Sequence, residues 1–174
     1  CGRRVMPLAR RLDDRHTVYI DRRFPSKRRE KSPHRYRAVI GVGGNIGDTR
    51  RRMHHLWVYL VKLSLLQPIQ GGVILRNPPF GYSEQNDFDN TVIEIATSLE
   101  PKALLRLILK IEKRFGRKRS FPNAPRTLDL DILFFDDRVI RSEKLNIPHL
   151  HWQERKSVTI PLGSLTHKSV RRRL

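Results

Sequence analysis

The sequence predicts an α+β domain in which helices pack on an antiparallel sheet. Three observations predict it: β-branched apolar runs alternate with two segments of helical periodicity, the elements follow the order β-α-β-β-α-β, and short polar loops join the strand pairs. The chain has 174 residues, 38% of them apolar, which suits one compact domain with an appendage. No apolar run approaches the ~20 residues of a membrane-spanning helix, so we expect no integral membrane protein.

The first half of the domain is expected to supply two strands around one helix. Residues 38–42 form a β-branched run before a glycine-rich turn, and they predict the first strand. Asp48 is placed to cap the following helix, which we expect to close at residues 67–68. The apolar residues of this helix recur at helical spacing: Met53, Leu56, Trp57, Leu60 and Leu63. Residues 73–75 predict the second strand.

The second half is expected to begin with a strand at residues 88–97 that buries much of both its faces. A helix follows, with Pro101 in its first turn and Gly116 at its end. Further strands are expected at residues 128–135, 139–140 and 157–161. This order favours a ferredoxin-like β-α-β-β-α-β sandwich with an antiparallel sheet.

The charge is strongly unbalanced, with 36 Lys and Arg against 17 Asp and Glu, a net charge of +19. Such an excess indicates a polyanionic partner, either a nucleic acid or a small polyphosphate. The single Cys excludes a disulfide framework and a zinc cluster built on thiolates. No secretory signal pattern is visible, and we expect a cytoplasmic protein.

Residues 1–35 are expected to form a basic, partly disordered N-terminal extension, and residues 36–174 the folded domain. The extension holds 12 basic and 4 acidic residues, which favours a solvated arm over a dedicated RNA-binding tail. One part of it differs, because residues 18–20 predict a short strand. Together with Phe24, that strand could dock on the domain.

The sharpest local signal is the pair Asp129 and Asp131. On a strand, side chains two apart point to the same face, so the two carboxylates are expected to lie side by side. They would repel each other unless a cation lies between them, and oxygen ligands without His or Cys favour Mg²⁺. The alternative is a structural ion network in which nearby arginines neutralise both acids.

The basic loop before this strand favours the metal site. Arg117, Lys118, Arg119 and Arg126 lie between the second helix and the acidic strand. Carboxylates that hold a metal beside guanidinium groups are typical of phosphoryl transfer, and the expected substrate is a nucleotide polyphosphate.

For each of the other candidate residues, a purely structural role is the alternative to ligand binding. Phe88 and Asn90 share one strand face and could hold a planar heterocycle, although a buried Phe beside a satisfied Asn is commoner. Residues 77–81 form a rigid extended loop that could present backbone groups to a ligand or only connect two strands. His149 could touch a phosphate or ribose, or simply be exposed. The glycines at 41–47 match neither a dinucleotide nor a Walker motif and predict a tight strand-to-helix turn.

Taken together, these segments resemble the 6-hydroxymethyl-7,8-dihydropterin pyrophosphokinase family of folate biosynthesis. The string Pro-Arg-Thr-Leu-Asp-Leu-Asp at 125–131 is the most specific motif. The motifs that carry the resemblance are collinear: 43–48, 77–81, 85–90, 97–99, 111–112, 116–117, 125–131, 148–149, 155 and 161–162.

The resemblance implies an enzyme that moves the pyrophosphoryl group from ATP to the hydroxymethyl group of the pterin, leaving AMP. It implies two Mg²⁺ ions on Asp129 and Asp131. No strong general base is evident, and Asp131 is our candidate, with loss of the proton to solvent as the alternative. The implied catalytic arginines are Arg117, Arg119 and Arg126. The implied pterin-binding residues are Asn77, Pro78, Pro79, Phe80, Phe88 and Asn90. The implied ATP-binding residues are Glu112, Arg117, Arg126, Ile132, His149 and Arg155. Small-molecule substrates, no membrane and a monomer are expected.

Two departures from the family pattern stand out. Residues 121–124 replace an Arg-Trp-Gly segment, with one residue fewer. Ser157 stands where the family has a second aromatic residue against the pterin. The alternative function is a small basic RNA-binding module on a ferredoxin-like sheet. It is disfavoured because the aromatic strand pattern of such modules is missing.

Overall fold

The computed structural model describes residues 8–29 and 31–166. Within these residues, seven strands form one antiparallel sheet in the order β1-β2-β5-β6-β3-β7, and β4 also pairs with β6. The elements are β1 (Leu8–Asp13), β2 (His16–Ile20), β3 (Tyr36–Gly44), α1 (Thr49–Val61), β4 (Leu66–Gly71), β5 (Ile74–Asn77), β6 (Phe88–Thr97), α2 (Pro101–Arg114), β7 (Asp129–Phe135), β8 (Ile140–Arg141), β9 (Asn146–Ile147), η1 (Trp152–Glu154) and α3 (Lys156–Gly163).

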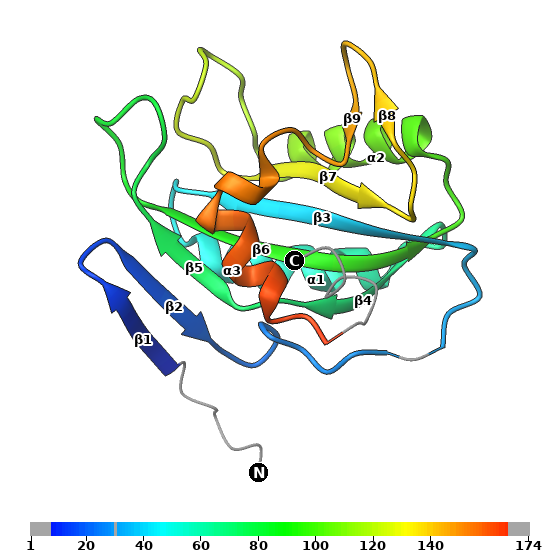
Figure 1. Cartoon of the computed structure of the whole chain (residues 1–174), viewed down its shortest axis with the longest axis horizontal. Coiled ribbons are helices and arrows are strands. Elements are labelled where there is room, and N and C mark those ends of the chain that lie inside the picture. Colours follow the sequence, from blue (N-terminus) through cyan, green and yellow to red (C-terminus); the bar gives the residue numbers. More distant parts are fainter. Residues whose placement is uncertain (1–7, 30, 167–174) are drawn as a thin grey trace.

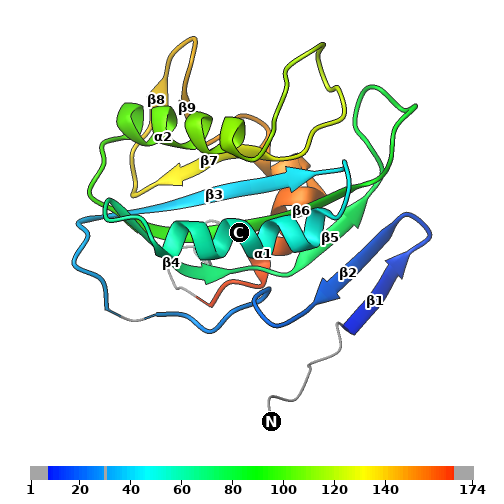
Figure 2. The same ribbon diagram turned by 180° about the vertical axis from the view of Figure 1, so that it is seen from behind.

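The central elements confirm the predicted fold class. β3, α1, β5, β6, α2 and β7 follow one another in the expected order, and the sheet order β5-β6-β3-β7 is that of a ferredoxin-like sandwich. Helices α1 and α2 cover one face of the sheet, and α3 lies against the other face (Figures 1 and 2).

The larger core lies between the sheet and the helices α1 and α2. Leu56, Ile93 and Leu104 are essentially inaccessible to solvent there. Asp48 accepts a hydrogen bond from the Arg51 amide and caps α1 as predicted. The predicted closure of this helix at residues 67–68 is wrong. Helix α1 ends at Val61, and Pro68 lies in β4 beside a register shift, where a strand tolerates a missing amide proton.

The strand predicted at residues 157–161 is wrong, because this segment forms helix α3. Its β-branched residues suggested a strand, but Val158, Pro161 and Leu162 recur at helical spacing and are buried. Val158 and Leu162 pack in a second core cluster with Val39 and Val92 on the sheet face opposite α1 and α2. Tertiary packing therefore overrides the local β preference.

Two short strands lie outside the main sheet. The edge strand predicted at residues 139–140 is observed as β8, which pairs only with β9 in a separate two-stranded sheet. This hairpin projects from the side of the molecule that carries α2 and β7 (Figure 1).

The N-terminal segment joins the sheet. The strand expected at residues 18–20 is present within β2, which pairs with β5, and β1 pairs with β2 outside it. Solvent reaches every residue of β1, whereas Val18 is buried. Phe24 is fully buried and packs edge-on against Trp57 of α1, with 5.8 Å between ring centroids. The strand and Phe24 therefore dock on the domain.

Candidate functional site

The two aspartates lie at the start of the edge strand β7. Asp129 pairs with Gly43 and Asp131 with Gly41 across β3. Leu130 between them is buried in the larger core. The alternation of strand side chains therefore directs both carboxylates away from that core and toward the same side.

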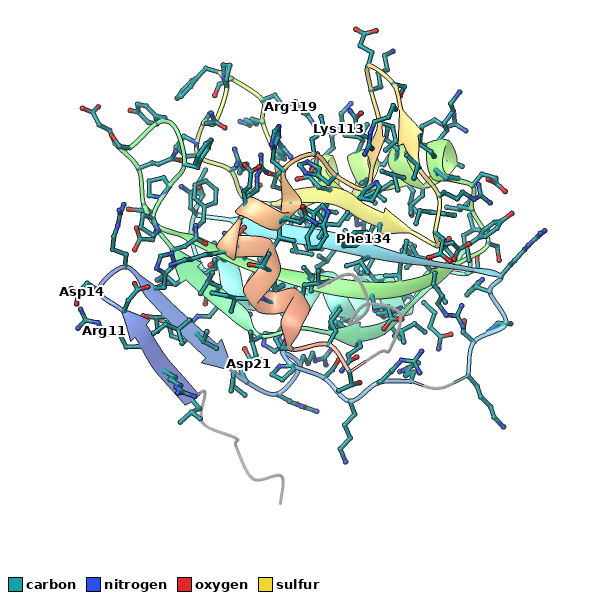
Figure 3. The ribbon with its side chains drawn as sticks, in the orientation of Figure 1. Arg11, Asp14, Asp21, Lys113, Arg119 and Phe134 are labelled. Atoms are coloured by element: carbon teal, nitrogen blue, oxygen red, sulfur yellow. The ribbon has the colours of Figure 1, made fainter. Side chains whose placement is uncertain are left out.

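A cleft of about 1200 Å³ lies in front of these carboxylates. The basic loop after α2 forms much of its wall, and α2 itself, the β8–β9 turn and the start of α3 contribute further residues. Its charged lining residues are Glu112, Lys113, Arg117, Lys118, Arg119, Arg126, Asp129, Asp131, Lys144 and Arg155. Arg119 and Lys113, which both line this cleft, are labelled in Figure 3. A cleft with this lining accommodates a large polyanion beside two acids.

Arg117 connects α2 to the acidic strand. It pairs with both Glu112 and Asp129, while the Leu130 amide donates a 2.8 Å hydrogen bond to Oε1 of Glu112. Burial raises the pKa of Glu112, against the lowering effect of that amide and of Arg117. Burial also disfavours the charge of Arg117, but Asp129 and Glu112 outweigh it and raise the pKa of this guanidinium. The structure therefore holds Arg117 charged at the cleft.

The two aspartates have different surroundings. Asp129 pairs with Arg117 and, at 3.0 Å, with Nε of Arg126. Asp131 is exposed in the cleft, and unlike that of Asp129 its carboxylate forms no ion pair with residues 8–29 or 31–166. Desolvation by the surrounding protein, followed by the like charge of Asp129, raises the pKa of Asp131. The charges of His149, Arg117 and Arg155 act in the opposite direction but do not cancel this rise. Asp129 therefore has direct guanidinium partners, whereas His149, Arg117 and Arg155 act on Asp131 through their charge alone.

This donor set fits Mg²⁺. The two carboxylates supply hard oxygen ligands on one face, and the open cleft leaves room for water and phosphate oxygens to complete the coordination. No group of three or more His, Cys, Asp or Glu side chains that could hold a metal occurs in the described part of the chain.

A second group of candidates lies on the neighbouring strands. Asn77 pairs with Phe88 across β5 and β6, and Nδ2 of Asn90 donates a 2.7 Å hydrogen bond to Oδ1 of Asn77. A Cβ atom on Gly43 would lie 2.4 Å from Oδ1 of Asn90, so glycine is required beside this amide. Phe88 is buried, and Cζ of Arg126 lies 4.8 Å from its ring centroid. These contacts join the amide pair to the basic loop.

The loops around the site are tied together by Asn45, which is buried. Its Oδ1 accepts a 2.9 Å hydrogen bond from the Arg126 amide, and its Nδ2 donates to Oε1 of Gln85 at 2.8 Å. Tyr82 and Phe121 add an edge-on ring contact, with 5.3 Å between centroids. The loop of residues 78–87 and the loop of residues 115–128 are therefore held against each other.

The remaining predicted residues fall into three groups. Arg155 lines the cleft, and the half-buried His149 is fixed by its amide, which donates to the Leu133 carbonyl at 2.9 Å. Ile132 lies in the larger core, on the strand face opposite the aspartates. Pro78 and Pro79 are half-buried, whereas the side chain of Phe80 is 84% exposed. His149 and Arg155 both act on Asp131 through their charge.

Sequence reasoning missed Lys144 as a cleft residue and Asn45 as the residue that ties the loops together. Lys144 carried no local signal, because only the β8–β9 turn brings it to the cleft. Asn45 lies in the glycine-rich turn before α1, but its partners Gln85 and Arg126 are 40 and 81 positions away in the chain.

The cleft holds two strand carboxylates and several guanidinium groups, and the amide pair Asn77 and Asn90 lies on neighbouring strands. This combination is typical of the enzymes of phosphoryl transfer. Residues 39–167 match the family model of 7,8-dihydro-6-hydroxymethylpterin-pyrophosphokinase. This match covers most of the chain, which belongs to that family. It supports the pyrophosphokinase interpretation and not the RNA-binding alternative.

Curated relatives agree with this family. The chain is 38% identical over 148 residues to the 2-amino-4-hydroxy-6-hydroxymethyldihydropteridine pyrophosphokinase of Helicobacter pylori, a match covering 84% of this chain and 91% of that protein. It is 41% identical over 131 residues to the enzyme of the same name from Campylobacter jejuni, covering 75% of this chain and 83% of the relative. For the Bacillus subtilis enzyme the identity is 38% over 128 residues, with 74% and 77% covered.

Proposed function

We propose that this chain transfers the pyrophosphoryl group of ATP to the hydroxymethyl group of 6-hydroxymethyl-7,8-dihydropterin, giving AMP and the pterin diphosphate. Family membership supports this activity. The observation that carries the proposal is the shared cleft, in which Asp129 and Asp131 lie beside Arg117 and Arg126. No helix among the described residues is long and apolar enough to span a membrane.

Asp129 and Asp131 would hold two Mg²⁺ ions. When bound, these ions would neutralise and orient the phosphate oxygens. The observation in favour is the raised pKa of Asp131, which results from the surrounding protein and from the charge of Asp129. A cation on the Asp131 side would remove that repulsion.

The arginines would bind the triphosphate. Arg117 and Arg126 both pair with Asp129 in this structure, so phosphate oxygens would compete with that carboxylate for their N–H groups. Arg119 and Arg155 are exposed at the cleft, and a nucleotide would compete with Glu112 for Arg119, because these two side chains lie 3.4 Å apart. Glu112 would keep Arg117 in place, and His149 would contact the ribose or a phosphate. Ile132 would contribute to the nucleotide site through its backbone, since its side chain is in the core.

The reaction joins the hydroxymethyl oxygen to the β-phosphorus and breaks the bond from that phosphorus to the oxygen that stays with AMP. Positive side chains near the β- and γ-phosphates stabilise the charge that develops on their oxygens. The hydroxyl proton is lost to Asp131 or to solvent. Alignment of the two substrates supplies much of the rate enhancement in such reactions.

The pterin would lie near Asn77, Phe88 and Asn90. Asn77 and Asn90 offer amide donors and acceptors to the heterocycle, and Phe88 offers its ring in place of the contact it makes with Arg126. The backbone of Pro78, Pro79 and Phe80 would complete this subsite, because the side chain of Phe80 extends into solvent.

The decisive experiment is incubation of the purified protein with MgATP and 6-hydroxymethyl-7,8-dihydropterin, followed by separation of the nucleotides. AMP in equal amount to the pterin diphosphate supports the proposal, whereas ADP would indicate transfer of a single phosphoryl group. Omission of Mg²⁺ is expected to abolish AMP formation. Activity that persists with a strong chelator would contradict the metal assignment.

A cytoplasmic location and a monomeric state belong to the same proposal. Light scattering of the purified protein tests the second, with a mass of 20.5 kDa expected. A mass of twice that value would contradict it. Fractionation of cells tests the first, and recovery in the membrane fraction would count against it.

A further inference from the structure

The β1–β2 hairpin lies outside residues 39–167, the part of the chain that matches the family model. It continues the sheet beyond β5, the strand that carries Asn77 (Figure 1). Figure 3 marks its turn by Arg11 and Asp14. The hairpin therefore adds residues next to β5, along one border of the proposed heterocycle subsite.

The strand register identifies the residue that lies nearest this subsite. Thr17 of β2 pairs with Arg76 of β5. Extending this register by one position places His16 opposite Asn77, which in turn pairs with Phe88 of β6. Neighbouring strands are about 4.8 Å apart, so His16 and Phe88 lie on strands separated by about 10 Å, on either side of Asn77.

These side chains share one face of the sheet. Val18 packs with Val73 and Leu75 on the face that carries α3, and His16 is two residues from Val18 on the same strand. Because strand side chains alternate, His16 points to the α3 face. Asn77 is two residues from Leu75, so it points to that face as well.

His16 is held in a defined position. Its Nδ1 lies 2.8 Å from Oδ1 of Asp13, and its side chain is 16% exposed. Asp13 also lies 3.8 Å from Nζ of Lys156, at the start of α3. The hydrogen bond from the Arg15 amide, followed by that from His16, lowers the pKa of Asp13. The Asp13 carboxylate therefore fixes the ring and links the hairpin turn to α3.

We propose that His16 is a positioning residue that forms the outer wall of the pterin subsite, an inference that rests on the proposed function. Because Asp13 engages Nδ1, Nε2 is the ring nitrogen that remains to hydrogen-bond with a polar group at the edge of the heterocycle. The flat imidazole also supplies a ring on the side where Ser157 has none. The N-terminal extension thus contributes to substrate recognition.

The test compares His16→Ala with His16→Gln and with Arg10→Ala, a matched control on the exposed strand β1. We expect His16→Ala to raise the KM for the pterin about tenfold, as loss of one well-placed hydrogen bond predicts, while the KM for ATP changes less than twofold. His16→Gln is expected to recover part of the loss, because its side-chain amide can form a hydrogen bond in place of Nε2. Arg10→Ala is expected to match the parent.

Equilibrium binding gives a readout that does not need turnover. The intrinsic fluorescence of the pterin, titrated with each variant in the presence of a non-hydrolysable ATP analogue, is expected to report the same tenfold loss for His16→Ala. Equal affinities for His16→Ala and Arg10→Ala would overturn the inference. So would an equal rise in both KM values. Absence of AMP formation by the parent would instead reject the proposed function, so the two failures are distinguishable.

Discussion

Arg126 stacks on Phe88, with its Cζ 4.8 Å from the ring centroid. The same guanidinium places Nε 3.0 Å from Oδ2 of Asp129. One side chain therefore connects the acidic strand to the proposed pterin subsite. Binding of phosphate oxygens at one end and of a heterocycle at the other would both act on Arg126.

Replacement of Arg126 by alanine is expected to lower kcat for AMP formation by about 10²-fold, because a cation placed against developing phosphate charge is worth several kcal/mol. Arg126→Lys is expected to recover little of this loss, since an ammonium group can neither stack on Phe88 nor bind in a bidentate manner. Steady-state kinetics measures both effects. Arg51→Ala, on the exposed surface of α1, is the control, and an equal loss there would contradict the assignment.

Asp131→Asn is expected to stabilise the metal-free protein while it removes activity. The raised pKa of Asp131 means that its ionised form is disfavoured in the folded state by the surrounding protein and by Asp129. Solvent in the cleft screens part of this effect, so a rise in Tm of about 1–2 °C is expected. Thermal unfolding in the presence of a chelator measures it, and MgATP turnover should fall by at least about 10²-fold.

A drop in the Tm of the metal-free Asp131→Asn variant would show that the carboxylate has a structural partner. Asp129→Asn is the comparison. It removes an acid that pairs with both Arg117 and Arg126, so it is expected to lower the Tm even though it carries the same chemical change.

The ion pair between Asp21 and His54 predicts a loss of stability in acid. Their side chains meet at 2.9 Å between Oδ2 and Nε2. Burial acts to raise the pKa of Asp21, but hydrogen bonds from His54 and the Arg23 amide outweigh it and hold the pKa below its usual value. The contribution is therefore complete above the unfolded pKa of about 3.9 and is lost as pH falls through the lower folded value.

Urea unfolding of the parent and of Asp21→Asn measures this contribution. The parent is expected to be more stable at pH 6, with a difference that shrinks as the pH falls below about 3.9. A constant difference across this range would mean that the carboxylate charge is not its source.

Phe24→Ala is expected to cost about 3 kcal/mol of unfolding free energy, because a fully buried ring in contact with Trp57 is removed. Phe80→Ala makes the same chemical change at a side chain that is 84% exposed, and a cost within about 0.5 kcal/mol is expected. Denaturant titration compares the two. Similar costs would show that the N-terminal segment does not depend on Phe24 for docking.

The sequence predicted the central fold because its signals are local. The helical spacing of Leu56 and Leu60 and the β-branched run before the glycine-rich turn each indicate an element without knowledge of distant contacts. Helix α3 could not be predicted in this way. Val158 and Ile160 favour a strand locally, and only packing against Val39 and Val92 makes the helical arrangement the stable one.

In the candidate site, too, some features follow from the local sequence and others depend on contacts between distant segments. Asp129 and Asp131 share a face because of strand geometry alone, so their proximity could be predicted. The contact between Arg126 and Phe88 could not, since it depends on how two loops meet through Asn45. The position of His16 beside Asn77 depends on the pairing of β2 with β5, which no local pattern in residues 1–35 specifies.

The β1–β2 hairpin also determines which strand forms this edge of the sheet and has unpaired backbone hydrogen-bonding groups. β5 would otherwise present unpaired amide and carbonyl groups, next to the apolar Ile74 and Leu75, to any other extended chain. With the hairpin in place, the outermost strand is β1, whose Arg10 and Arg11 discourage such pairing by repulsion. A protein that begins at residue 36 lacks this hairpin and is therefore expected to self-associate, independently of any effect on catalysis.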